Sequence, residues 1–428
     1  MALIGGGLMK KKVLLKGPLL TRSGYGEQSR FALRSLRTRP DLFDIFIQPL
    51  QWGHTSWISE ASEERAWIDH TIEKTIGYMQ QGGQFDMSVQ VTIPNEWEKL
   101  APVNIGYTAG IETTKVAPIW LQKANEVVDR IVVVSSHSKN VYENTVAEAS
   151  MSDSQEKFDY RLEKPISAVN YPVKVYDNLE EIELDVKTDF NFLAVAQFGP
   201  RKNLPNTLKW FLEEFQEEES VGIILKSNIA KNCFMDREKL LEDLKQFTAS
   251  VPDHKCKVYL LHGDMTDAEI HSLYRNKKVS AFLALPHGEG FGLPIFEAAY
   301  SGLPVVATGW SGQLDFLVDE NRKEHFYNVS YDLQPVQDQV VWADVLIKES
   351  MWAYAREQSA KEKMRLCYND ITQEVPDSVA ARSCEYATEL AERFSEDKLY
   401  AQFVEALIPA EELKQLDDEI EGLLSDLL

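Results

Sequence analysis

The residues best suited to chemistry lie in a glycine-rich stretch, residues 286–297, with the sequence PHGEGFGLPIFE. Glu289 falls within a predicted loop, and Glu297 falls one turn into a helix begun by Pro294, because proline fits a first helical turn. Three glycines in five residues let the backbone approach a ligand closely, and a helix N-terminus offers N–H groups to an anion. Two carboxylates so placed can bind two sets of hydroxyls on one ligand, such as a sugar and a ribose. In isolation, solvated loop and helix glutamates are the commoner interpretation.

A pair of cations, Arg201 and Lys202, follows the predicted strand Phe192–Ala196. The pair precedes an amphipathic helical pattern, so it lies at a helix N-terminus, where a diphosphate is stabilised. Lys226 ends the predicted strand Val221–Leu225, and a lysine at the carboxyl end of a parallel strand points into the ligand crevice. Adjacent Arg and Lys are usually a solvated pair. The nearby glutamate motif favours an anion site instead.

Alternating strands and helices position these residues, which predicts an α/β protein with parallel sheets. The run Lys12–Lys16, the glycine-rich loop after it and the β-branched run Ile131–Val134 indicate a first doubly wound domain. Residues 340–408 are predicted to be mostly helical. The expected organisation is an N-terminal acceptor-side domain at 1–170, a linker at 171–190, a nucleotide-sugar-binding domain at 191–385, and C-terminal helices at 386–428 that pack back across the domains.

Residues 287–308, HGEGFGLPIFEAAYSGLPVVAT, resemble the retaining glycosyltransferases of the GT-B fold, in particular family 4. The resemblance rests on two glutamates separated by seven residues, with EGFGLP at the first of them and a Gly-x-Pro-Val-Val strand afterwards. Weaker similarity extends from the loop near residue 24 to the helix that ends near Leu407. The resemblance implies two Rossmann-like domains facing across a cleft. It also implies transfer of a sugar from a UDP- or GDP-linked donor to an acceptor hydroxyl, with retained configuration.

The same resemblance assigns roles on the donor side. Glu289 is expected to contact the donor sugar and Glu297 the nucleotide ribose. Lys202 matches the family's lysine that clamps the diphosphate, and Arg201 is expected to substitute for the family's arginine, which usually lies nearer the strand. The other donor-binding candidates are Gly290, Phe291, Gly292, Leu293, Lys226, Gly263, Asp264 and His287.

On the acceptor side, Gly24, Tyr25 and Gly26 match the family's glycine-rich loop, which approaches the diphosphate and the acceptor. Many relatives carry a histidine after the strand in block 104–114, whereas this sequence has Glu112 in a Glu-Thr step that resembles some relatives. We expect Glu112 to contact the acceptor or to assist its departing proton; a loop glutamate without a role is the alternative. The acceptor class stays open between a saccharide, a lipid-linked saccharide and a modified DNA base.

Charge is unevenly distributed along the chain. The net charge of −22 over 428 residues excludes a protein that is basic all over and coats nucleic acid. Residues 1–40 hold nine Lys or Arg and one acid, which gives +8 and leaves −30 for the remainder. Arg30, Arg34 and Arg37 share a helix face, which indicates either a solvated face or a phosphate-rich acceptor.

Two alternatives to a saccharide-directed enzyme stay open. The opening block, residues 16–45, bears a loose likeness to glycosyltransferases of large tailed phages, some of which glycosylate hydroxymethylated DNA bases. A DNA-modifying enzyme is therefore one alternative, and a non-catalytic nucleotide-sugar-binding protein of the same fold is the other.

The sequence contains no Asp-x-Asp, so we expect neither a metal nor any other cofactor. Four cysteines without C-x-x-C spacing fit a reducing compartment, and we expect a cytoplasmic protein, in the host cytoplasm if phage-encoded. No apolar run approaches the ~20 residues of a membrane helix, and residues 1–8 are predicted to be a loose leader. A terminal heptad pattern predicts either a helix packed on its own domain or a homodimer contact; it comprises Leu413, Leu416, Ile420, Leu423 and Leu427.

Overall fold

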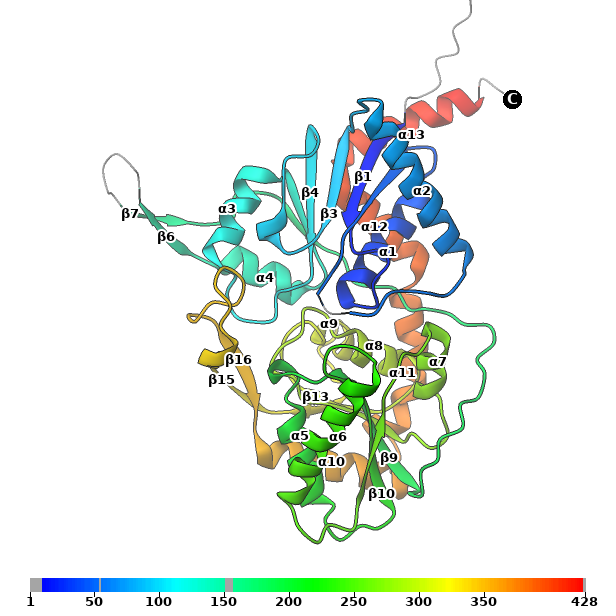
Figure 1. Cartoon of the computed structure of the whole chain (residues 1–428), viewed down its shortest axis with the longest axis vertical. Helices are drawn as coiled ribbons and strands as arrows, with labels where there is room; N and C mark the ends of the chain where they lie inside the picture. The colour runs from blue at the N-terminus through cyan, green and yellow to red at the C-terminus, as the bar shows by residue number, and fades with distance from the viewer. Residues whose placement is uncertain (1–9, 54, 151–156, 426–428) are drawn as a thin grey trace, which may run out of the picture.

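The computed structural model describes residues 10–53, 55–150 and 157–425, which form two lobes stacked one above the other (Figure 1). The N-terminal lobe is built on a parallel sheet with the strand order β2-β1-β3-β4-β5-β8. Its strands are β1 Lys11–Gly17, β2 Phe43–Pro49, β3 Met87–Val91, β4 Val103–Thr108, β5 Arg130–Val133 and β8 Ile166–Ala168. The predicted leader, residues 1–8, lies outside the described residues.

The C-terminal lobe repeats this plan. Its sheet is also parallel, in the order β11-β10-β9-β12-β13-β14. The strands are β9 Phe190–Gln197, β10 Val221–Asn228, β11 Lys257–Leu261, β12 Ala281–Ala284, β13 Val305–Thr308 and β14 Tyr327–Val329. The predicted fold class, with two doubly wound α/β domains, is confirmed.

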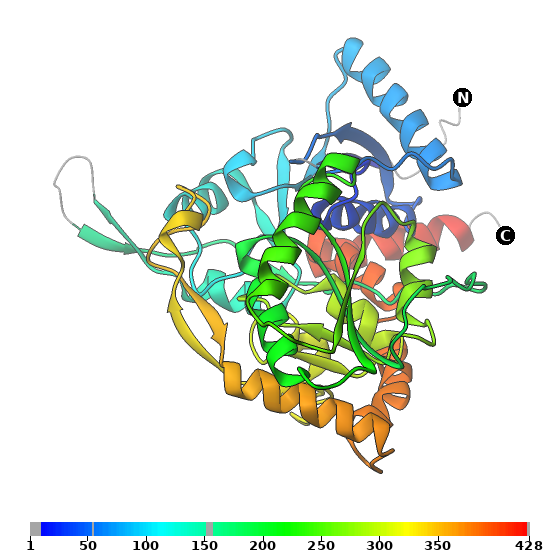
Figure 2. The same cartoon turned by 60° about the horizontal axis from the view of Figure 1, so that its bottom comes forward.

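Helices cover both faces of each sheet, which explains why the central strands are nearly continuous apolar runs. Figure 2 shows this layering from below. In the N-terminal lobe the helices are α1 Gly24–Arg37, α2 Glu63–Gln80, α3 Pro118–Val127 and α4 Ser136–Asn144, with a short 3-10 turn at η1 Pro94–Glu96. In the C-terminal lobe they are η2 Pro200–Lys202, α5 Leu204–Glu214, α6 Phe234–Ala249, α7 Asp267–Tyr274, α8 Leu293–Tyr300, α9 Leu314–Leu317 and α10 Glu357–Thr372.

The order of the strands fixes where a ligand can bind. β1 lies between β2 and β3, and β9 lies between β10 and β12, so the connections leave each central strand in opposite directions. A crevice opens at the carboxyl ends of strands at such a switch point. The loop that leads to Gly24 follows β1, and the loop that carries Arg201 and Lys202 follows β9. Both predicted phosphate-facing loops therefore lie at the switch point of their own sheet.

Two crossings connect the lobes. Residues 169–189 run between them without regular secondary structure, where the linker was predicted. The chain returns through α11 Val379–Arg393, which packs on α8, and α12 Glu396–Leu407, which packs on α1 (Figure 1 and Figure 2). The return falls between α11 and α12, because Phe394 still packs on Phe296 of the C-terminal lobe whereas Phe403 packs on Phe31 of the N-terminal lobe. The predicted boundary at residue 386 lies inside α11.

The last helix, α13 Ala410–Ser425, lies on the N-terminal lobe. Leu413, Leu416 and Ile420 pack partly buried against that lobe's core, and ion pairs join Lys11 to Glu412 and Arg39 to Asp417. Much of the heptad pattern is thus covered by its own domain. Leu427 lies outside the described residues, as does the side chain of Leu423.

An arm from the C-terminal lobe forms a third contact between the lobes. β15 Tyr331–Pro335 and β16 Met351–Ala355 pair antiparallel, with η3 Asp338–Val340 in the segment between them. In that segment Val345 and Ile347 pack against the N-terminal core around Trp120 and Tyr142. The prediction that residues 340–408 are mostly helical is confirmed from residue 357 onward by α10, α11 and α12, whereas Met351–Ala355 is a strand that pairs with β15. A second hairpin, β6 Ala147–Ser150 with β7 Lys157–Tyr160, projects from the N-terminal lobe.

Candidate active site

A cavity of about 920 Å³ opens between the two lobes. It is lined by the loops at the carboxyl ends of β1 and β4 on one side, and by those of β9, β10, β11 and β12 on the other. Most of the predicted site residues line it together: Gly24, Tyr25, Glu112, Arg201, Lys202, Lys226, Gly263, Asp264, Glu289, Gly290, Phe291, Gly292, Leu293 and Glu297. Residues that are far apart in the sequence therefore face one space.

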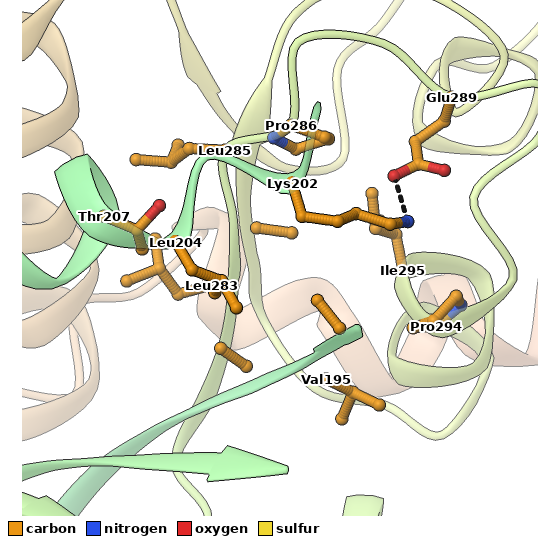
Figure 3. A pocket seen from close by; sticks show the side chains of 13 residues that line it. Val195, Lys202, Leu204, Thr207, Leu283, Leu285, Pro286, Glu289, Pro294 and Ile295 are labelled. Atoms are coloured by element: carbon orange, nitrogen blue, oxygen red, sulfur yellow. Dashed lines mark hydrogen bonds and ion pairs between the residues drawn. The ribbon is translucent and has the colours of Figure 1, made fainter. Parts of the chain in front are cut away.

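Glu289 is the centre of a buried charge cluster. Its side chain is only 9% exposed, and its carboxylate lies 2.5 Å from Lys202 Nζ and 2.9 Å from Arg201 Nη1. Figure 3 shows the Lys202 side chain reaching from its loop toward the Glu289 carboxylate. Burial opposes ionisation, but the charges of Arg201 and Lys202 outweigh it and lower the pKa of Glu289. Glu289 is therefore held as an anion between two cations.

Backbone and amide contacts fix the two loops that form this cluster. Asn203 has a left-handed backbone with φ 53°, which ends η2 and aims its side-chain amide at the Leu285 carbonyl at 3.1 Å. The backbone N–H of His287 donates to the Arg201 carbonyl at 2.8 Å. The loop after β9 and the loop after β12 thus position each other.

Arg201 also connects the lobes. Its Nε lies 2.8 Å from Glu112 Oε2 of the N-terminal lobe, and its Nη1 donates to the Gly288 carbonyl at 2.8 Å. Glu112 and Glu289 therefore share one guanidinium. Burial raises the pKa of Glu112 despite the opposing charge of Arg201.

The glycines of the motif serve contact between the lobes as well as ligand approach. A Cβ on Gly288 would lie 2.1 Å from the Glu112 carbonyl oxygen, and a Cβ on Gly290 would lie 2.1 Å from the Ala109 carbonyl oxygen. Gly292 has φ +97° at the start of α8, a conformation that favours glycine. From the sequence, the glycines were expected to let the backbone approach a ligand. The structure shows a second reason for them, which is the close backbone contact between the lobes.

Glu297 is in a different electrostatic environment from Glu289. It accepts a hydrogen bond from Tyr274 Oη at 3.0 Å. Burial raises the pKa of Glu297 to about 7, although the positive charge of Lys174 opposes the shift. This carboxyl group can therefore change protonation near neutral pH.

Three of the predicted donor-binding residues, Lys226, Gly263 and Asp264, lie together at the carboxyl ends of β10 and β11. Lys226 Nζ donates to the Gly263 carbonyl at 2.5 Å, and Asn232 donates to Asp264 at 2.6 Å. Burial lowers the pKa of Lys226. These contacts hold polar groups along one end of the cavity.

Two predicted site residues are not among the described residues that line the cavity. Gly26 lies against Thr21, whose carbonyl oxygen would be 2.1 Å from a Cβ at that position, so this glycine permits close packing at the start of α1. His287 is buried, bonds the Ala353 carbonyl through Nδ1 at 2.9 Å, and stacks on Trp352. It anchors β16 rather than contacting the cavity.

Two of the three arginines on the face of α1 pair with acids of the chain. Arg30 is 7% exposed and bonds the carbonyls of Leu19 and Thr21 as well as Glu27. Arg34 pairs with Glu64 at 2.7 Å, while Arg37 lies over the Trp67 ring. Arg30 and Arg34 are thus held by acids of the chain, whereas Arg37 is exposed at the end of the helix.

Several cavity residues were not found from the sequence. Lys174 comes from the linker and pairs with Glu27 at 3.0 Å and Asp267 at 2.9 Å. Trp52 follows β2 and lines the cavity, whereas Tyr274, at the end of α7, contacts the site through its hydrogen bond to Glu297. Each reaches the site through tertiary contact, so neither spacing nor a local motif could identify it.

The described residues contain no group of three or more His, Cys, Asp or Glu side chains placed to hold a metal ion. Over the same part of the chain, every helix falls short of the length and apolar character that crossing a bilayer requires.

Known proteins resemble this chain both in sequence and in fold. Residues 176–333 match the family model described as glycosyl transferases group 1. The chain is 26% identical over 193 residues, 44% of its length, to the serotype-specific mannosyltransferase WbdA of Escherichia coli, of which it covers 22%. It is 26% identical over 170 residues, 35% of its length, to probable sucrose-phosphate synthase 4 of Oryza sativa subsp. japonica, of which it covers 15%. The chain thus spans about a fifth or less of the length of these curated relatives.

Solved structures share the whole fold. Sucrose-phosphate synthase from Thermosynechococcus elongatus superposes with a TM-score of 0.56 at 10% identity, over 97% of this chain and 100% of that one. HepE of Anabaena, solved with UDP and glucose, gives a TM-score of 0.55 at 13% identity, over 93% and 99%. The architecture is therefore that of the GT-B glycosyltransferases. The match to the glycosyl transferases group 1 model falls largely within the C-terminal lobe.

Proposed function

We propose that this chain is a retaining glycosyltransferase of the family 4 type, which moves a sugar from a nucleotide-diphosphate sugar to an acceptor hydroxyl without a metal ion. The observation that carries the proposal is the buried cluster of Arg201, Lys202 and Glu289 at the switch point of the matched domain. Cations at this position can neutralise a leaving diphosphate, while the carboxylate beside them binds sugar hydroxyls.

The proposed step needs no protein nucleophile. The bond between the anomeric carbon and the diphosphate oxygen breaks, and a bond from that carbon to the acceptor oxygen forms on the same face of the sugar. The acceptor proton passes to the departing diphosphate oxygen, so atoms and charge balance. Lys202 and Arg201 stabilise the charge that develops on the diphosphate, and Glu289 fixes the sugar ring in position.

The remaining roles follow from the arrangement of the cavity. Glu297 is proposed to accept hydrogen bonds from the ribose, and Lys226, Gly263 and Asp264, which line the same cavity, are proposed to bind the nucleotide base. Glu112, from the opposite lobe, is proposed to face the acceptor. A UDP- or GDP-linked hexose is the donor to test first, because relatives are named as a mannosyltransferase and as a protein solved with UDP and glucose. We further infer a cytoplasmic location from the sparse cysteines.

A nucleotide-sugar panel tests the proposal. The protein is incubated with UDP-, GDP- and ADP-sugars, and slow donor hydrolysis and thermal stabilisation are recorded. We expect both with at least one donor. Stabilisation without any turnover would indicate the non-catalytic binding protein, and no response to any donor would contradict the proposal. Transfer to a hydroxymethylated DNA duplex would support the DNA-modifying alternative.

Replacement of Lys202 by Ala tests the cation cluster. We expect kcat to fall about 10²–10³-fold, because a group that stabilises charge in the transition state is lost. Lys209→Ala is the matched control, since Lys209 lies on α5, outside the cluster, and its side chain is 49% exposed. Equal activities of the two variants would contradict the role of Lys202.

A further inference from the structure

An aromatic wall forms part of the N-terminal side of the cavity, apart from the cluster around Glu289. Tyr25, from the first turn of α1, and Trp52, from the loop after β2, have ring centroids 4.3 Å apart and planes inclined by 35°. Both residues line the cavity. The roles proposed for the donor do not use these two rings.

The position of the wall is fixed by backbone contacts. Tyr25 Oη lies 2.8 Å from Thr108 Oγ1 and accepts hydrogen bonds from the backbone N–H groups of Ala109 and Gly110 at 3.3 and 3.1 Å. The Ala109 carbonyl in turn packs on Gly290, the residue next to Glu289. One layer of backbone therefore separates the wall from the loop that holds the proposed donor sugar.

The polar groups on the same side of the cavity as the wall include three hydroxyls and a carboxylate. Ser23, Thr55, Ser56 and Glu60 line the same side of the cavity. A sugar ring has an apolar face of C–H bonds that packs on an aromatic ring, and hydroxyls around its edge that need polar partners. An aromatic face bordered by such groups matches both requirements.

The cations on this side are engaged with acids of the chain. Arg22 pairs with Glu60 and donates to the Met265 carbonyl at 2.7 Å. Arg34 pairs with Glu64, and Lys174 with Glu27, as described above. A DNA duplex needs several cations on one surface to neutralise consecutive phosphates, whereas on this side Arg22, Arg34 and Lys174 are each held by an acid of the chain. The chemistry of this side favours an uncharged ligand.

We propose that Trp52 and Tyr25 form an acceptor subsite for a neutral saccharide, which stacks on the Trp52 indole and presents a hydroxyl toward the donor sugar beside Glu289. This inference rests on the proposed glycosyltransferase function and narrows its acceptor to one class. The lobe that holds the subsite then selects the acceptor, while the opposite lobe holds the donor.

The experiment uses the full chain and the donor that the nucleotide-sugar panel identifies. The acceptor probes are methyl α-glucoside, methyl α-mannoside, N-acetylglucosamine, maltose and a hydroxymethylated DNA duplex. Wild type is compared with Trp52→Ala, Trp52→Phe and Trp57→Ala. Trp57 is the matched control, because it lies in the same loop, is 47% exposed, and is not among the described residues that line the cavity.

We expect at least one saccharide to be glycosylated. Trp52→Ala should raise the KM for that saccharide about tenfold, with a smaller rise for Trp52→Phe, which retains an aromatic face. The KM for the donor should change by less than about twofold in both, as should the KM for the saccharide in Trp57→Ala. Thermal melting of each variant checks that the fold is retained.

The possible failures are distinguishable. If wild type turns over no donor, the proposed function fails, and the acceptor proposal fails with it. If the donor turns over but only the DNA duplex is glycosylated, or no saccharide probe is, the saccharide subsite is wrong while the glycosyltransferase proposal stands. An unchanged saccharide KM in folded Trp52→Ala would overturn the role of the wall.

Discussion

The two glutamates of the motif show that burial alone does not decide the charge of a carboxyl group. Arg201 and Lys202 overcome the effect of burial and lower the pKa of Glu289. Glu297 has a tyrosine hydroxyl as its direct partner, and burial raises its pKa to about 7. Neighbouring side chains thus give the two residues different charge states near neutral pH. One is a fixed anion beside the proposed diphosphate site, whereas the other can titrate.

This titration predicts a pH-dependent contribution to stability. The pKa of Glu297 rises from an ordinary 4.5 to about 7 on folding, so the native state binds a proton that the unfolded state has lost between these values. Its stabilising contribution is therefore complete below pH 4.5 and is lost as the pH rises to about 7. The free energy of unfolding of wild type, measured by urea denaturation relative to Glu297→Gln, should fall across this window and then level off. If the free energies of unfolding of the two proteins change in parallel with pH, folding does not raise the pKa of Glu297 and the prediction is wrong.

Individual residues were predictable from the sequence where their relationship is local. Glu289 and Glu297 share one loop and helix, and Lys202 follows its strand directly, so spacing along the chain was sufficient. Trp52 reaches the cavity by packing on Tyr25, and Lys174 by pairing with Glu27 and Asp267, which are contacts between residues far apart in the sequence. His287 was placed in the donor site because it adjoins the motif, yet its side chain turns toward β16. Adjacency in sequence does not fix the direction of a side chain.

At the scale of elements, α12 is the piece of the C-terminal region that stabilises the N-terminal lobe. Phe403 is fully buried, with its ring centroid 5.3 Å from that of Phe31 and 5.0 Å from that of Tyr107. It fills a space between α1 and β4. The N-terminal sheet therefore depends on residues from the other end of the chain.

Replacement of Phe403 by Ala should lower the free energy of unfolding by about 3–5 kcal/mol, because it removes a buried aromatic ring and leaves a cavity. Phe158→Ala is the matched control, since Phe158 lies on β7 and is 41% exposed; we expect a change within about 0.5 kcal/mol. Chemical denaturation monitored by circular dichroism measures both. A loss of unfolding free energy in Phe403→Ala as small as that expected for Phe158→Ala would mean that Phe403 contributes little to the stability of the lobe.

The elements were predictable from the sequence to different degrees. Buried parallel strands such as β5 and β9 are visible as apolar runs, and the Thr266–Glu269 capping box marks the start of α7. The arm formed by β15 and β16 was missed because β15, with the sequence YDLQP, is mostly exposed and carries no apolar run. Its position depends on contacts with the N-terminal lobe around Trp120, which no local pattern encodes.

At the scale of the whole molecule, the basic segment at the start of the sequence does not form a basic region of the same strength in the folded protein. The +8 opening segment lies in the N-terminal lobe, but acids from elsewhere in the chain neutralise much of it, as in the pairs Lys16–Glu98 and Arg39–Asp417. The cations that remain beside the cavity's central carboxylate are Arg201 and Lys202, on the opposite lobe. The two cations that contact Glu289 therefore come from the lobe that is proposed to bind the anionic donor.

The contact between the lobes at Gly290 predicts that activity depends on closure. A methyl group on this residue would lie 2.1 Å from the Ala109 carbonyl oxygen, a fixed backbone atom at the end of β4. Gly290→Ala must therefore separate the lobes at the point where Arg201 joins Glu112, while each lobe keeps its own core. Because a displacement of about 1 Å can cost 10²-fold in rate, we expect kcat/KM to fall at least that far while thermal stability changes little.

Small-angle X-ray scattering and steady-state kinetics test this prediction together. Gly77→Ala is the control, since Gly77 lies in α2 with open space around its Cβ position, and it should retain both wild-type activity and dimensions. In Gly290→Ala the radius of gyration with bound nucleotide should exceed that of wild type. If Gly290→Ala matches wild type in both measurements, the backbone at Ala109 has moved to accommodate the methyl group. The close contact at Gly290 would then not be required to bring Glu112 to Arg201. A loss of activity without any expansion would point to a local effect on the Glu289 loop and would likewise contradict the dependence on closure.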